Sequence, residues 1–387
     1  MNPYFFNQKA LVVGAGAMGG GIAQVLVEAG WAVLLYDTQD AALENGITRV
    51  RGVWDKLLEK GKISDAQRSA YFAQLQPAYV LREAVDVSLA IEAIYENLDA
   101  KRSVFTTLDD VVREDCILAT NTSSLSVSSI ASGVKRADRV VGLHFFNPAP
   151  LMPLVEIVPG LATDPAVVAA CVDAVASWNK VGVVAQDTPG FLVNRIARPY
   201  YGEALHLVEE RMADMATVDW ALTELGGFRM GPFALMDLIG HDVNYVVTET
   251  VWKQFYYDPR FRPSLSQKRL LEAGWLGRKS GRGFYDYRNG ASLPEPTRDE
   301  ALGRCIVDRV VAMLINEAAD AVYRGIGTES DVETAMLKGV NYPKGLIAWG
   351  REWGWTAVRD QIEALHRRTG DSRYRVCPWI HDQISAQ

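Results

Sequence analysis

A histidine and a glutamate stand twelve positions apart in an otherwise apolar part of the chain. His144 and Glu156 both belong to the segment LHFFNPAPLMPLVEIV, residues 143–158. A neutral imidazole accepts a proton near pH 7, and a carboxylate beside it fixes its tautomer and stabilises the imidazolium that forms. The pair is therefore a candidate general base and its partner. A histidine that only satisfies a turn is the structural alternative.

A glycine-rich turn near the N-terminus predicts a site for a phosphate-containing cofactor. An apolar run over residues 10–13 leads into GAGAMG, where Gly14, Gly16 and Gly19 have the G-x-G-x-x-G spacing. In a dinucleotide-binding turn the first glycine permits the tight turn and the second lets the backbone approach a pyrophosphate. The third lets the following helix pack closely, and the N-terminus of that helix attracts the anion.

A carboxylate follows at the distance expected for a contact with an adenosine ribose. Asp37 lies eighteen residues after Gly19, at the end of a second apolar run over residues 31–36. A negative charge there repels a 2′-phosphate, and no arginine follows in DTQD, so the pattern predicts NAD and not NADP. A glycine-rich turn in another kind of α/β protein is the alternative.

Composition limits the kinds of partner. The 387 residues carry a net charge of -7, which argues against nucleic acid or an acidic membrane surface as a partner. Hydrophobic residues make up 49% of the chain, which is typical of globular proteins of two or three domains at this length. The segment MNPYFFNQKA lacks the pattern of a signal peptide. Four cysteines without a C-x-x-C pair predict neither disulfides nor a metal site and fit the reducing cytoplasm: Cys116, Cys171, Cys305 and Cys377.

Alternating strand and helix patterns over residues 1–187 predict a doubly wound α/β sheet of the Rossmann type. Apolar runs continue from VDVSLAIEAI to VGVVAQD, with helical patterns over 99–112 and 164–179 between them. A charged segment over about 40–74 interrupts this order and predicts a helical hairpin that projects from the sheet. His144 ends the run RVVGLHF, and strand ends face the ligand crevice in such sheets.

Helical patterning replaces the strand pattern after residue 187. Thr188 followed by Pro189 predicts that a helix starts there, with the threonine as its N-cap. Two helical domains are expected, over 188–290 and 291–387. The polar, proline-containing segment DYRNGASLPEPTRDE separates them.

The two helical domains resemble each other, which indicates a duplicated module. The segment that begins NRIARPYYGEA is echoed by the segment that begins DRVVAMLINEA, at an offset of 114 residues. Glu203 then aligns with Glu317, and Asp308 stands opposite Asn194. Chance similarity between amphipathic helices is the alternative.

Seven segments in family order make the chain resemble the 3-hydroxyacyl-CoA dehydrogenases over nearly its full length. They are GAGAMGGGIA, EAIYENLDAK, TNTSSLSV, GLHFFNPAPLMPLVEIV, DTPGFLVNR, MGPFALMDLIG and GRKSGRGFYDY. The resemblance implies oxidation of (3S)-3-hydroxyacyl-CoA to 3-oxoacyl-CoA, with hydride transfer to NAD. Because this reaction releases a proton, high pH should favour oxidation and low pH reduction.

The resemblance also implies roles for four catalytic residues. His144 is expected to take the hydroxyl proton, with Glu156 as its partner. Ser123, in NTSSLS, and Asn194, in PGFLVNR, are expected to bind the substrate and position its reacting oxygen. The structural alternatives are a turn cap for Ser123 and a helix-end cap for Asn194.

Further matching positions are expected near the cofactor or near coenzyme A. Glu96, Lys101 and Asn147 match cofactor positions, and Lys268 is a weaker cofactor candidate. Lys56 is the best candidate for a contact with the coenzyme A phosphates, although Lys56 and Lys101 could equally be solvated surface charges. The projecting segment offers Arg49, Arg51, Lys56, Lys60 and Lys62 as basic residues for such contacts.

The duplicated module bears on assembly and on the number of active sites. Many family members have one helical module and pair through it as dimers, so the second copy here could replace that partner and give a monomer. A homodimer is the other possibility. Asp308 in place of Asn194, and the lack of a second nucleotide domain, predict one active site per chain. No hydratase-like domain precedes Met1, which predicts a stand-alone dehydrogenase.

Two other functions stay open. A dehydrogenase of a CoA-free hydroxy acid or a carnitine-like substrate shares much of this architecture. A non-catalytic NAD-binding protein needs only the glycine turn and Asp37, so the set Ser123, His144, Glu156 and Asn194 argues against it. The acyl group also stays open, because short, dicarboxylyl and longer fatty chains all fit the sequence.

Overall fold

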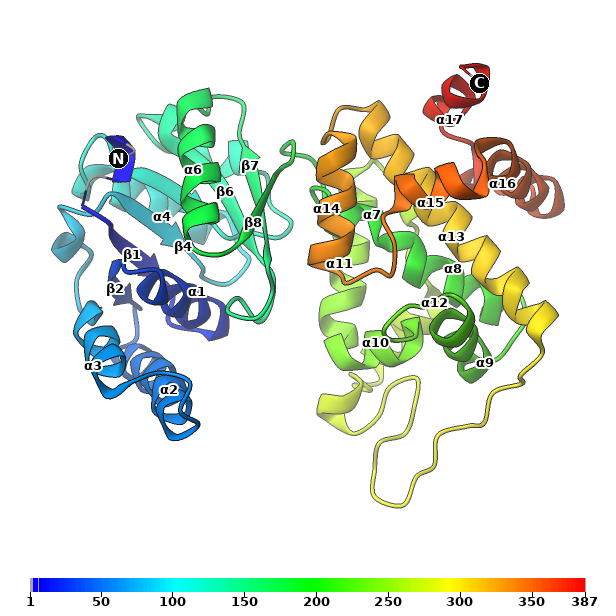
Figure 1. Ribbon diagram of the computed structural model, residues 1–387, viewed down its shortest axis with the longest axis horizontal. Coiled ribbons are helices and arrows are strands. Elements are labelled where there is room, and N and C mark those ends of the chain that lie inside the picture. The colour runs from blue at the N-terminus through cyan, green and yellow to red at the C-terminus, as the bar shows by residue number, and fades with distance from the viewer. Residues whose placement is uncertain (1–2, 6, 387) are drawn as a thin grey trace. The chain divides into compact units, whose positions relative to one another are not determined.

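The computed structural model describes residues 3–5 and 7–386, which divide into two compact units (Figure 1). The first unit ends at Thr188 and the second begins at Pro189. Strands and helices alternate in the first unit, and helices make up nearly all the regular structure of the second. Within the described residues, no helix is both long and apolar enough to cross a membrane.

An eight-stranded sheet forms the centre of the first unit. Its strand order is β3-β2-β1-β4-β5-β6-β7-β8, and all pairings are parallel except that of β6 with β7. The predicted Rossmann-type sheet is confirmed. The strands are β1 (Lys9–Val13), β2 (Ala32–Tyr36), β3 (Leu75–Ala78), β4 (Leu89–Glu92), β5 (Ile117–Thr120), β6 (Val140–Phe145), β7 (Leu154–Pro159) and β8 (Val181–Val184).

The edge strand β3 is absent from the sequence-based expectations. Its sequence is LQPA, which combines a glutamine and a proline in four residues. Proline cannot donate to a sheet ladder and is therefore confined to edges and strand starts. Pro77 lies on such an edge, where β3 pairs only with β2. A strand of this kind forms because it pairs with the neighbouring strand, and its sequence shows no alternation of apolar and polar residues that would predict it.

Helices connect the strands of the first unit, and two of them occupy the charged segment over 40–74. Trp54 of α2 is fully buried and donates a hydrogen bond from Nε1 to Glu28 Oε1 of α1 (2.9 Å). Ser64 begins α3 with a capping box that involves Gln67. The helices are α1 (Ala17–Glu28), α2 (Asp40–Glu59), α3 (Asp65–Gln74), α4 (Leu98–Val111), α5 (Val127–Ala131) and α6 (Pro165–Ser177).

In the second unit, the first helix starts later than predicted. Gly190 and Phe191 have positive φ angles of 76° and 48°, which interrupt a helical path after Pro189. The predicted helix start at Thr188 is therefore wrong, and α7 begins at Val193. The helices are α7 (Val193–Ile196), α8 (Arg198–Glu209), α9 (Met215–Trp220), α10 (Pro232–Ile239), α11 (His241–Gln254), α12 (Leu265–Glu272), α13 (Glu300–Tyr323), α14 (Glu329–Gly339), α15 (Leu346–Trp353), α16 (Trp355–Thr369) and α17 (Pro378–Ser385).

Reciprocal ion pairs join the two halves of the helical unit. Arg195 Nε donates to Glu317 Oε1 (2.7 Å), and Arg309 Nε donates to Glu203 Oε2 (2.7 Å). Arg309 and Glu317 are the residues that an offset of 114 pairs with Arg195 and Glu203. Each half thus contributes the same arginine and the same glutamate to the other half, as in a twofold-symmetric interface.

A third contact follows the same symmetry. Arg260 Nη1 donates to Glu317 Oε2 (3.0 Å), and the hydroxyl of Tyr374 donates to Glu203 Oε2 (2.9 Å). Tyr374 also lies 114 residues after Arg260. This repeated geometry supports a duplicated module whose copies pack face to face within one chain.

The symmetric ion pairs make a prediction about stability. Substitution Arg309→Met leaves the carboxylate of Glu203, which is 3% exposed, without its main partner. Removal of one member of a buried pair should lower the free energy of unfolding by about 3–5 kcal/mol. Urea denaturation followed by circular dichroism measures this loss.

The matched control is Arg304→Met on the same helix, where the arginine is exposed and forms an ion pair with the exposed Glu300. That substitution should cost less than about 1 kcal/mol. Equal losses in the two variants would contradict a stabilising role for the buried interface.

Candidate active site

The carboxyl ends of three neighbouring strands carry the main candidate residues of the first unit. β4, β5 and β6 are adjacent and parallel. Glu92 ends β4, Ser123 follows β5 by three residues, and His144 lies near the end of β6. The carboxyl ends of parallel strands meet at one edge of the sheet, so these residues lie at the same edge, which is where ligands bind in open α/β sheets.

His144 and Glu156 form a buried hydrogen bond. They lie directly opposite each other in the antiparallel register of β6 and β7. His144 Nδ1 is 2.6 Å from Glu156 Oε2, and the two residues are 5% and 0% exposed. The predicted proximity of the two side chains is therefore confirmed. Because the carboxylate accepts this bond, Nδ1 carries the proton and Nε2 is the basic nitrogen of the neutral ring.

Glu96 organises the loop that contains Ser123. Its Oε1 accepts hydrogen bonds from the backbone N–H groups of Ser123 (3.0 Å) and Ser124 (3.1 Å) and from the hydroxyl of Thr122. Burial acts to raise the pKa of Glu96, but the charge of Lys101 and these hydrogen bonds outweigh it and lower that pKa. The carboxylate therefore stays ionised and holds the loop. The hydroxyl of Ser123 makes no hydrogen bond with any described residue.

Lys101 supports this arrangement from inside the protein. Its Nζ lies 2.6 Å from Glu92 Oε1 and 3.3 Å from Glu96 Oε2, and the residue is 1% exposed. The hydroxyl of Thr120 donates to the other oxygen of Glu92 (2.7 Å). The interpretation of Lys101 as a solvated surface charge is therefore wrong. Sequence reasoning missed Glu92, whose only signal is a carboxylate at the end of the apolar run VSLAIE.

Asn121 is a second residue that sequence reasoning missed. Its Oδ1 accepts a hydrogen bond from the backbone N–H of Phe145 (2.8 Å), the residue directly after His144. The amide thereby fastens the Ser123 loop to β6. A polar residue in a loop gives no sign of such a partner, because the bond spans 24 positions in the sequence.

A cavity of about 500 Å³ lies at the carboxyl ends of β1, β2 and β4. Its rim includes the glycine turn and Asp37, whose Oδ2 accepts a hydrogen bond from the N–H of Ala15 (2.9 Å). This hollow therefore joins the two features from which NAD binding is predicted. Its lining residues are Val13, Gly14, Gly16, Tyr36, Asp37, Thr38, Ala93, Ile94, Tyr95, Ala100, Ser103 and Val104.

The three glycines of the turn differ in whether the protein itself leaves room for a side chain. Gly14 has φ +105°, and a Cβ there would lie 2.6 Å from the carbonyl oxygen of Ala93. A Cβ on Gly19 would lie 1.7 Å from the carbonyl oxygen of Gly14. At Gly16, in contrast, nothing lies within 4 Å of such an atom. The open space at Gly16 fits a ligand that approaches the backbone there.

The basic residues of the α2 region fall into two groups. Arg49 donates to the carbonyl oxygens of the glycine turn, and Arg51 to those of the chain around the end of α3. Lys56, Lys60 and Lys62 are exposed and make no ion pair with any described residue. Lys56 and its two neighbours therefore have their ammonium groups available for phosphates. Asn147 is exposed in the loop between β6 and β7.

The remaining candidates lie in the second unit. Asn194 lies on α7, where it is half-buried. Lys268 is exposed on α12, 3.7 Å from Glu272, beside a hollow of about 650 Å³. Asp308, the counterpart of Asn194, lies on α13, where partial desolvation by its surroundings raises the pKa of its carboxyl group. A carboxylate at this position does not reproduce the amide of Asn194.

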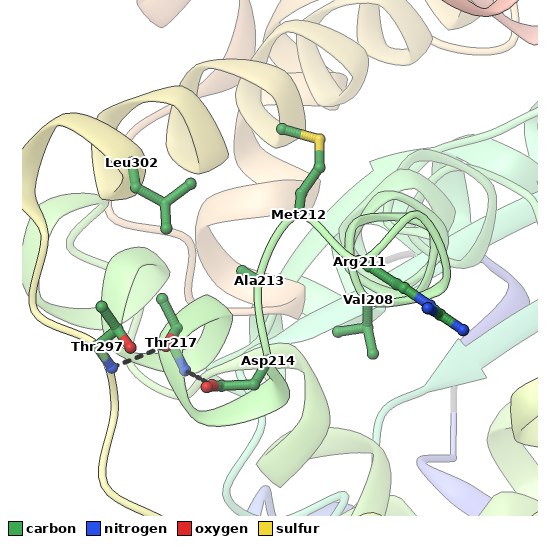
Figure 2. Close-up of a pocket in the computed structure, with 8 residues that line it drawn as sticks. All are labelled: Val208, Arg211, Met212, Ala213, Asp214, Thr217, Thr297 and Leu302. Carbon is green, nitrogen blue, oxygen red and sulfur yellow. Dashed lines mark hydrogen bonds between the residues drawn. The ribbon is translucent and has the colours of Figure 1, made fainter.

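Another hollow of the helical unit, of about 390 Å³, contains none of the predicted site residues (Figure 2). Three of its polar residues bond to one another. Asp214 caps α9 through the N–H of Thr217 (2.8 Å), and the hydroxyl of Thr217 accepts from the N–H of Thr297 (2.9 Å). These bonds hold the segment before α13 against α9, so a structural role accounts for these polar residues of the hollow.

Comparisons with known proteins agree with this geometry. The model of the family "3-hydroxyacyl-CoA dehydrogenase, NAD binding domain" matches residues 9–188. The model "3-hydroxyacyl-CoA dehydrogenase, C-terminal domain" matches residues 190–287 and again 305–387. The C-terminal model thus covers both halves of the helical unit.

Similar proteins differ in how much of this chain they cover. A 3-hydroxyadipyl-CoA dehydrogenase of Escherichia coli (strain K12) is 35% identical over 97% of both chains. A probable 3-hydroxybutyryl-CoA dehydrogenase of Bacillus subtilis (strain 168) is 38% identical over 74% of this chain and 99% of its own. The crystal structure of a 3-hydroxybutyryl-CoA dehydrogenase from Escherichia coli K12 has a TM-score of 0.93 at 35% identity and covers 97% of this chain and 98% of that one.

The open space at Gly16 makes a prediction about cofactor binding. Substitution Gly16→Ala should leave folding unchanged, because φ is −66° and no atom crowds the new methyl group. The methyl group would occupy space needed by the pyrophosphate, so the Kd for NADH should rise roughly 10- to 100-fold. Fluorescence titration with NADH measures the change.

The control is Gly52→Ala on α2, where a Cβ also meets no atom within 4 Å and which does not line the cavity. Its affinity for NADH should equal that of the wild type. An unchanged Kd in the Gly16 variant would show that the cofactor does not approach this turn.

Proposed function

We propose that this chain, which belongs to the 3-hydroxyacyl-CoA dehydrogenase family, oxidises (3S)-3-hydroxyacyl-CoA to 3-oxoacyl-CoA with His144 as the general base. The observation that carries this assignment is the buried hydrogen bond of 2.6 Å between His144 Nδ1 and Glu156 Oε2. It orients a basic nitrogen at the carboxyl end of β6, the edge of the sheet at which the glycine turn also lies. When bound, NAD accepts the hydride from the substrate.

His144 and Glu156 would divide the proton chemistry between them. The O–H bond of the substrate breaks and its proton moves to Nε2 of His144, while the C–H bond breaks as a hydride and the carbonyl forms. Glu156 stabilises the resulting imidazolium and holds the ring in one orientation. The burial of both groups strengthens their interaction, because little water screens it.

Ser123 and Asn194 would position the substrate. The Ser123 hydroxyl, which no described residue engages, is available to donate a hydrogen bond to the reacting oxygen. The Glu96–Lys101 network holds the loop on which it lies. Asn194, on α7, would supply an amide contact to the substrate. Such fixed contacts lower the entropic part of the barrier.

The remaining candidates would bind the cofactor and coenzyme A. Gly14, Gly16 and Gly19 would hold the pyrophosphate, and Asp37 would accept hydrogen bonds from the adenosine ribose. Glu96, Lys101, Asn147 and Lys268 stay assigned to the surroundings of the cofactor, and Lys56 to the phosphates of coenzyme A. The exposure of Lys56 and Lys268 supports contacts with a soluble ligand.

A monomer fits the helical unit best. The reciprocal pairs Arg195–Glu317 and Arg309–Glu203 support this, because they resemble the contacts of a twofold-symmetric interface but lie within one chain. The second module would therefore have a structural role, and one active site would serve each chain. The four cysteines are free, and three of them are buried, which supports a reducing compartment such as the cytoplasm.

A steady-state assay tests the reaction and its base together. Acetoacetyl-CoA should be reduced at the expense of NADH, whose absorbance is followed, and His144→Gln should lower kcat by roughly 1,000-fold or more. His381→Gln is the control, because His381 is exposed near the C-terminus. Activity of His144→Gln near the wild-type level would rule out this base.

A further inference from the structure

Arg198 is a buried arginine whose partners are all neutral. It is 6% exposed and lies at the start of α8. Its Nε donates to the carbonyl oxygen of Asn194 (2.8 Å), and its Nη1 donates to the hydroxyl of Thr248 (2.9 Å). The guanidinium also lies 4.9 Å from the ring centre of Tyr201. Among the described residues, no carboxylate lies within ion-pair distance of it.

Other buried arginines of the chain differ in this respect. Arg139, Arg195, Arg309 and Arg373 each form an ion pair with at least one carboxylate. A buried charge without a counter-ion is costly, because its desolvation is not offset. Burial accordingly lowers the pKa of Arg198. A ligand that carries a negative group would supply the counter-ion and would explain why an arginine is buried at this position without a carboxylate.

The position of Arg198 indicates which ligand. Asn194, a proposed substrate contact, precedes it by four residues, and the two are linked by the hydrogen bond from Nε. Asn194 lies on α7 and Arg198 begins α8, with only Ala197 between the two helices. Four residues of helical backbone rise by roughly 6 Å, so a group bound by Arg198 would lie a few carbon atoms from a group bound by Asn194. Nη2 makes no hydrogen bond with a described residue, which leaves donors for a carboxylate.

We propose that Arg198 binds the distal carboxylate of a short dicarboxylyl-CoA substrate and thereby selects it over a substrate whose acyl chain ends in a methyl group. This rests on the proposed dehydrogenase function. The ligand turns the unpaired guanidinium into a buried, hydrogen-bonded ion pair. A methyl end leaves the charge buried and unpaired, so it is bound less well.

Two substrates of equal chain length test the selection. The kcat/KM of the wild type should be roughly 100-fold higher for (3S)-3-hydroxyadipyl-CoA than for (3S)-3-hydroxyhexanoyl-CoA. Arg198→Met should remove this preference, with a loss of roughly 100-fold on the dicarboxylyl substrate and little change on the other. Arg304→Met, at an exposed arginine, is the control and should keep the wild-type preference.

Stability separates selection from a structural role. Methionine in place of an unpaired buried cation should leave the midpoint of thermal unfolding unchanged or higher. A lower midpoint together with equal losses on both substrates would overturn the proposal. So would a wild type that prefers the methyl-ended substrate. If Arg198→Met does not fold, the wild-type preference alone decides.

Binding separates this proposal from the proposed reaction. Adipyl-CoA and hexanoyl-CoA lack the 3-hydroxyl group, so titration calorimetry with them requires no catalysis. Suppose that the enzyme shows no turnover but binds adipyl-CoA more tightly than hexanoyl-CoA, and that Arg198→Met abolishes this difference. The selection by Arg198 would then be supported, and only the proposed reaction would be contradicted. Equal affinities for the two ligands in the wild type would overturn the selection itself.

Discussion

The hydrogen bond between His144 and Glu156 is the interaction on which the account of the site depends. A fully buried carboxylate is unfavourable unless it is paired, so Glu156 is explained by its partner. The pairing in turn requires β7 to run antiparallel to β6, because this register places the two residues opposite each other. The antiparallel direction of β7 in an otherwise parallel sheet is thus what brings the carboxylate to the imidazole.

A connected polar network keeps the neighbouring groups in place. Glu92, Lys101 and Glu96 link the ends of β4 and β5 to the loop of Ser123, and Asn121 links that loop to β6. Buried polar groups that are satisfied in this way give a rigid local structure. The catalytic candidates of the first unit are therefore fixed by neighbouring strand ends, whereas the glycine turn leaves open space at Gly16.

The sequence predicts features that have a local pattern. The sheet follows from alternating apolar runs, and the proximity of His144 and Glu156 follows from their places on two strands joined by a short connection. Other features depend on contacts that no local pattern reveals. The buried Lys101 has the composition of a surface residue, and Asn121 finds its partner across the sheet. Nothing in the sequence around Arg198 indicates that this arginine is buried without an ion pair.

The pH dependence of kcat in Glu156→Gln tests the central claim most directly. If the carboxylate orients His144 and stabilises its imidazolium, kcat should fall by roughly 1,000- to 10,000-fold at neutral pH. The affinity for NADH should stay unchanged, because Glu156 does not line the cofactor cavity. A kcat within a few-fold of the wild type, with the same pH profile, would contradict the account.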